Sequence, residues 1–81
     1  MKADVRVEGT RVRVRGFRPV IERIADRLLD TDYFYQVEGG LYGHRFAEFC
    51  VRFEAQEAAG WFAALAKDEL YGPGYAEPGI E

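Results

Sequence analysis

Apolar and polar residues follow two different periods along this chain. Four segments show the alternation, or the density of aromatic and β-branched residues, that is typical of half-buried strands: residues 4–8, 11–15, 33–38 and 44–54. Two others, residues 19–30 and 56–70, carry apolar side chains three and four positions apart, as an amphipathic helix does. The predicted order is therefore strand, strand, helix, strand, strand, helix.

The second half of this pattern repeats the first. Residues 12–29 align with residues 49–66 at an offset of 37 positions, and residues 5–9 are echoed by residues 35–39. Each copy contains a strand, a turn, a second strand and a helix, so the chain is predicted to consist of two similar ββα units.

The alternation also assigns side chains to the two faces of a sheet. The inward residues would be Val5, Val7, Val12, Val14, Tyr35, Val37, Phe49, Val51 and Phe53. We predict an α+β fold of order ββαββα, in which two helices cover one face of a four-stranded antiparallel sheet. Trp61, in the middle of the second helix, is predicted to anchor this core against Phe49 and Phe53.

A single domain over residues 1–70 fits the length of 81 residues, and a tail rich in Gly, Pro and Tyr follows over residues 71–81. Cys50 is the only cysteine, so an internal disulfide is excluded and a reducing cytoplasm is the expected location. Residues 1–30 contain eight bases and five acids, whereas residues 31–81 contain three bases and nine acids. The first unit is therefore basic and the second acidic.

Residues with catalytic potential are few. His44 and Cys50 would lie about 20 Å apart along one extended strand, too far for a thiol–imidazole pair. Asp30 and Asp32 have no third metal ligand nearby in the sequence, and the glycines of residues 39–43 lead into a strand rather than into a helix, as a phosphate-binding loop would. We predict no enzyme activity, no metal site and no cofactor.

The face of the sheet away from the helices would carry five basic and five acidic residues. Phe34 and Phe46, with Cys50 nearby, would form a small apolar island among these charges, which is typical of a contact with another protein. Two alternatives stay open at this point. Cross-strand ion pairs on a solvated face explain the charges without any ligand, and a register slip of one residue would turn both Phe side chains into the core.

These observations predict a small protein-binding module without catalytic activity, of the inhibitor or regulator kind. The further comparison with immunity and anti-defence factors is analogy at the level of class alone. The predicted partner-binding residues are on the open sheet face, in a long loop over residues 39–43 and in the tail: Arg13, Arg15, Phe34, Gln36, Leu41, Tyr42, Phe46 and Tyr75. The same face could also join two copies of the chain as a homodimer.

The alternative function is nucleic-acid binding. Arg6, Arg11, Arg13 and Arg15 on the first hairpin, with Arg18 nearby, could follow a phosphate backbone. Phe34 and Phe46 could stack on bases. The net charge of −3 and the balanced open face give this alternative less support than protein binding.

Overall fold

The computed structural model describes residues 3–72 of the chain. The elements within this range are β1 (Asp4–Glu8), β2 (Arg11–Phe17), α1 (Arg18–Leu28), β3 (Tyr35–Tyr42), β4 (Phe46–Phe53) and α2 (Gln56–Tyr71). This confirms the predicted α+β class and the order ββαββα. Most of the predicted tail, with Tyr75, lies outside the described residues.

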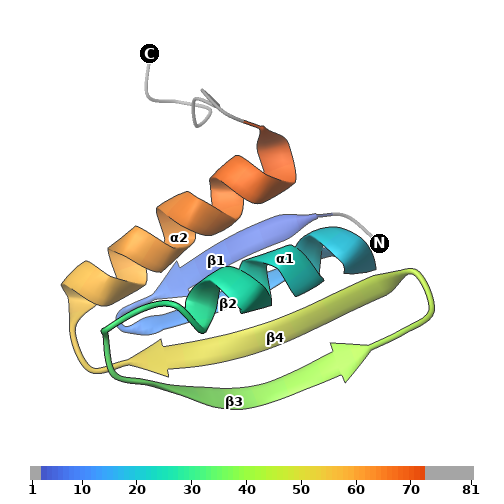
Figure 1. Ribbon diagram of the computed structural model, residues 1–81. Coiled ribbons are helices and arrows are strands. Elements are labelled where there is room, and N and C mark those ends of the chain that lie inside the picture. The colour runs from blue at the N-terminus through green and yellow to red at the C-terminus, as the bar shows by residue number, and fades with distance from the viewer. Residues whose placement is uncertain (1–2, 73–81) are drawn as a thin grey trace.

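The four strands form one antiparallel sheet in the order β1-β2-β4-β3. The second strands of the two ββα units pair with each other in the centre, and the first strands form the two edges. Exchanging the units leaves this order unchanged, so they are related by an approximate twofold axis through the sheet. Both helices lie on the same face and run in opposite directions (Figure 1). Neither helix in the described range is long and apolar enough to span a bilayer.

The core lies between this sheet and the two helices. Val12 and Val14 of β2 and Val51 of β4 are fully buried, as the alternation predicts. The aromatic anchor, however, is Phe62 rather than Trp61. Phe62 is completely buried, with its ring centroid 5.6 Å from that of Phe53 and 6.2 Å from that of Phe49.

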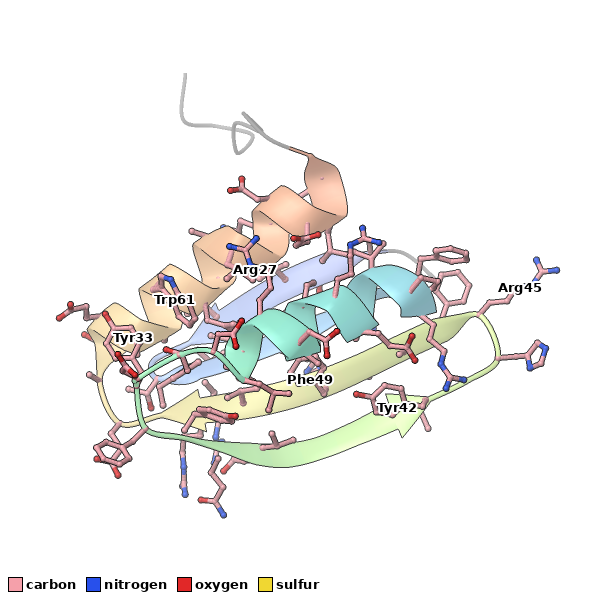
Figure 2. The ribbon with its side chains drawn as sticks, in the orientation of Figure 1. Arg27, Tyr33, Tyr42, Arg45, Phe49 and Trp61 are labelled. Atoms are coloured by element: carbon pink, nitrogen blue, oxygen red, sulfur yellow. The ribbon has the colours of Figure 1, made fainter. Side chains whose placement is uncertain are left out.

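Trp61 lies at the margin of the core instead. Its ring is partly buried and packs on Tyr33 with a centroid distance of 5.6 Å (Figure 2). The prediction was wrong because the helices do not keep the offset of 37 positions. The buried residues of α1, Ile21, Ile24 and Leu28, correspond at an offset of 38 to Ala59, Phe62 and Ala66, which are buried in α2. One extra residue between β4 and α2 therefore moves the buried stripe of α2 by one position in the sequence, which corresponds to about 100° around the helix.

The helix layer is displaced from the centre of the sheet. Helix α2 packs on β1, β2 and β4, and α1 packs on β2 and β4, whereas neither helix packs extensively on β3. Val7 on β1 and Val37 on β3, both predicted to be core residues, are 46% and 53% exposed. They face the helix side of the sheet but lie outside the area that the helices cover.

Ion pairs join the two helices above the core. Arg23 and Arg27 of α1 donate from Nε and Nη1 to the two carboxylate oxygens of Glu69 in α2, at 3.1 and 3.2 Å. Arg27 extends from α1 toward α2 in Figure 2. The hydrogen bond from Arg23, followed by that from Arg27, lowers the pKa of the Glu69 carboxyl, although partial burial opposes the shift.

We expect this clamp to make stability depend on pH. A carboxyl whose pKa is lowered in the folded state contributes its full stabilisation above its unfolded pKa of about 4.3 and loses it as the pH falls through the folded value. Because both arginines are more than half exposed, the effect should be about 1 kcal/mol or less. Urea unfolding between about pH 3 and pH 7 should show a loss of stability at low pH that is smaller in Glu69→Gln. An equal loss in both proteins would contradict the role of the clamp.

The core assignment can be tested by comparing two neighbouring aromatic residues. Phe62→Ala should lower the free energy of unfolding by about 3–5 kcal/mol because it opens a cavity at the centre of the core. Trp61→Ala should cost only about 1–2 kcal/mol, since its ring is already partly exposed. Chemical denaturation of the two variants measures this difference, and an equal or larger cost for Trp61 would contradict the assignment.

Candidate functional site

The open face, meaning the side of the sheet opposite the helices, is the largest surface without a covering element. The following side chains lie on it: Asp4, Arg6, Glu8, Arg11, Arg13, Arg15, Phe17, Gln36, Glu38, Leu41, Phe46, Glu48, Cys50 and Arg52. Arg13, Arg15, Gln36 and Phe46 are among the predicted partner-binding residues. The register therefore places these four on the expected side.

An apolar patch occupies one end of the open face and consists of Phe17, Leu41 and Phe46. Phe17 and Phe46 are direct partners in the β2–β4 ladder, and Leu41 lies opposite Glu48, one diagonal step from Phe46. Phe17 and Leu41 are 53% and 63% exposed. A shallow hollow beside Phe46 is lined by Leu41, Gly43, Ala47 and Glu48.

The sequence pattern does not reveal Phe17, because Gly16 and Pro19 interrupt the alternation and predict the end of the strand at residue 15. Instead, β2 continues through Gly16, which is buried on the helix side. A Cβ atom at this position would lie 2.8 Å from Cδ2 of Leu70 in α2, so glycine leaves room for the Leu70 side chain against the strand. The signal that could have revealed Phe17 is its parity, which it shares with Arg11, Arg13 and Arg15.

Phe34 does not belong to this patch. It precedes β3 directly, and its neighbour Tyr35 pairs with Phe53, whereas Phe46 is at the opposite end of β4. The two Phe residues are therefore roughly 25 Å apart along the sheet. The island predicted from Phe34 and Phe46 is wrong as a single cluster, and the 78% exposed Phe34 stands alone at the other end.

The predicted loop over residues 39–43 is strand for most of its length. Gly39 through Tyr42 belong to β3 and pair with β4 after a bulge between Val37 and Gly39. This bulge changes the parity of the strand, so Leu41 is on the open face and Tyr42 on the helix face. The Arg18 guanidinium carbon lies 5.9 Å from the centroid of the Tyr42 ring, which is visible near the start of α1 in Figure 2.

Most of the positive charge on the open face is balanced locally. Glu38 accepts from Nε of Arg11 at 2.8 Å and faces Nε of Arg52 at 3.5 Å. Arg52 also donates to Oε1 of Gln36 at 2.9 Å. Among residues 3–72, Arg13 forms no ion pair within 4.0 Å, and the register places it between Arg6 and Cys50.

The residues with catalytic or metal-binding potential are not brought together. His44 is exposed in the turn between β3 and β4, whereas Cys50 lies in the middle of β4 on the open face. The part of the chain that the structure describes contains no group of three or more His, Cys, Asp or Glu side chains suited to a metal ion. Tyr33 donates to Oε2 of Glu57 at 3.2 Å, and this hydrogen bond raises the pKa of the phenol.

Comparison with known proteins provides no relative for this site. No protein-family model matches the chain, and neither a curated protein nor a solved structure is significantly similar to it. The function must therefore be inferred from the geometry described above.

The charge balance of the open face can be tested through Glu38. Glu38→Gln should free Arg11 and Arg52, so the variant should elute from heparin at higher salt than the wild type. It should also lose about 0.5–1 kcal/mol of stability, as expected for an exposed ion-pair network. Asp26→Asn is the matched control, because it makes the same change in net charge on the exposed side of α1. Equal retention of the two variants would show that net charge alone determines binding to heparin.

Proposed function

We propose that this chain is a small protein-binding module without catalytic activity of its own, which inhibits or regulates another protein by contact through its open face. The observation that carries the proposal is the apolar patch of Phe17, Leu41 and Phe46 beside Arg15 and Glu48. As Cys50 is the only cysteine, we expect the module to act in a reducing cytoplasm.

The patch has the composition of an interface centre. Exposed aromatic and aliphatic side chains surrounded by charge are typical of protein contact sites, whose central residues supply most of the binding energy. Charges on the rest of the face are already paired with each other: Nε of Arg15, next to the patch, lies 3.9 Å from Oδ2 of Asp4, and Glu38 holds Arg11 and Arg52 at the other end of the sheet. A partner could therefore cover the rim without leaving many unpaired charges buried.

The charge distribution favours a protein partner over nucleic acid. A phosphate-binding sheet needs free arginines that neutralise phosphates and thereby displace the counterions of the nucleic acid. In this sheet, Glu38 holds two of the five open-face arginines, and Oδ2 of Asp4 lies 3.9 Å from Nη2 of Arg6 and from Nε of Arg15. In addition, Phe34 and Phe46 are too far apart to stack neighbouring bases on one short segment. Nucleic-acid binding by the arginine-rich hairpin is therefore retained as an outcome of the test.

The experiment is affinity capture with the tagged chain from a lysate of its own cells, with and without nuclease, followed by mass spectrometry. We expect one dominant protein that survives nuclease treatment. Replacing Phe17 and Phe46 together by Ala should weaken its binding at least about tenfold, the effect of losing a residue at an interface centre.

Phe34→Ala provides the matched control, since it removes the same type of side chain from the other end of the sheet. Binding should be retained in this variant. Loss of the partner after nuclease treatment would favour the nucleic-acid alternative. Loss in Phe34→Ala but not in the double variant would place the contact at the wrong end of the face for this proposal.

A further inference from the structure

The two edges of the sheet differ in how well they are protected. Three of the five residues of β1 are charged, and α2 packs beside this strand. In contrast, β3 has eight residues and contains neither Lys, Arg nor Pro, and seven of its residues are exposed in succession. Its single charge, Glu38, is held by Arg11 and Arg52. Proteins usually protect an edge of this length with charges or prolines, because its unpaired backbone groups attract another strand.

The backbone groups that β3 offers follow from its pairing with β4. The Gly43 amide donates to the carbonyl oxygen of Phe46 at 2.7 Å, so residue 43 points toward β4. Since these groups point alternately to either side of a strand, Leu41 also points toward β4, and Gly40 and Tyr42 point toward the free edge. After the bulge, the strand therefore presents two outward N–H and two outward C=O groups.

We propose that a second copy of the chain pairs with this edge, β3 against β3, to form a twofold dimer with a continuous eight-stranded sheet. With Leu41 on the twofold axis, Gly40 lies opposite the partner's Tyr42, and the two residues exchange both backbone hydrogen bonds. The symmetry-related pair, Tyr42 opposite the partner's Gly40, forms two more, so the junction contains four backbone hydrogen bonds. The two Leu41 side chains then meet on the open face beside the hollow at Phe46, which removes apolar surface from water.

A second copy fits this edge better than a charged strand does. An uncharged and partly apolar strand leaves no unpaired charge at the new junction, and the part of β3 after the bulge, residues 39–42, is itself such a strand. The charged edge β1 does not offer an equivalent surface. Each chain therefore has one open edge, so pairing of β3 with itself closes at two copies instead of continuing into a fibre. The dimer leaves Arg13 and Cys50 accessible and does not depend on the proposed function.

Sedimentation equilibrium of the purified chain over a range of concentrations tests the dimer. The wild type should reach twice the chain mass of 9.2 kDa. Leu41→Lys should weaken dimerisation at least about tenfold, because it places two like charges opposite each other on the axis. Val7→Lys makes the same charge change on the exposed part of β1 and should dimerise like the wild type. A second test uses a chemically synthesised chain with an N-methyl group on the Tyr42 amide. This group removes an outward N–H donor of the edge but keeps every side chain, so this chain should also dimerise less than the wild type.

The reactivity of Cys50 distinguishes pairing at the edge from pairing through the open face. In the edge dimer, its reaction rate with a thiol reagent should not change with protein concentration, whereas a face-to-face dimer should protect it. A monomeric wild type, a dimer that survives both edge modifications, equal dissociation of Val7→Lys, or protection of Cys50 would each overturn the proposal. The measurement needs no other protein, so its failure is separate from any failure to find a partner.

Discussion

The antiparallel pairing of β2 with β4 is the contact on which the rest of this structure depends. It joins the two ββα units through their central strands and aligns Val12 with Val51 and Val14 with Phe49. All four side chains are buried and point to the same face, so this pairing defines the side on which both helices must pack. It also makes the first strand of each unit an edge. The open face and the free edge of β3 are therefore both consequences of this pairing.

The basic first unit and the acidic second unit form ion pairs with each other within the molecule. Arg11 of the basic unit meets Glu38 of the acidic unit on the open face, and Arg23 and Arg27 meet Glu69 on the helix side. These ion pairs are exposed, so each contributes little to stability. Their more important consequence concerns recognition, because charges already paired within the chain do not attract a highly charged ligand. The surface that is left to bind a partner is apolar.

The sequence predicted the fold class because alternation and helical spacing report directly on burial. Once the strand is identified, alternation places Val12 and Val14 on the same face, and this apolar face must be the buried one. The errors occurred where a single residue shifts the frame. One extra position before α2 exchanged the roles of Trp61 and Phe62, and the bulge before Gly39 moved Leu41 onto the open face. Phe17 was missed because Gly16 and Pro19 interrupt the local pattern, although β2 continues to Phe17 through its pairing with β4.

The two units share a backbone arrangement but differ most at their edges and ends. The register makes Val5 and Val37 equivalent, since each lies opposite a buried valine of the neighbouring central strand. Beyond these positions, β1 continues with the charged Arg6 and Glu8, whereas β3 continues with one charge, Glu38, and then with two glycines, Leu41 and Tyr42. Core residues need only size and apolarity to preserve the fold, so a difference in the core would say little about function. The difference between the solvent-facing residues of the two edge strands has no such structural cause, which is why β3, rather than β1, is the edge at which contacts with other chains should be sought.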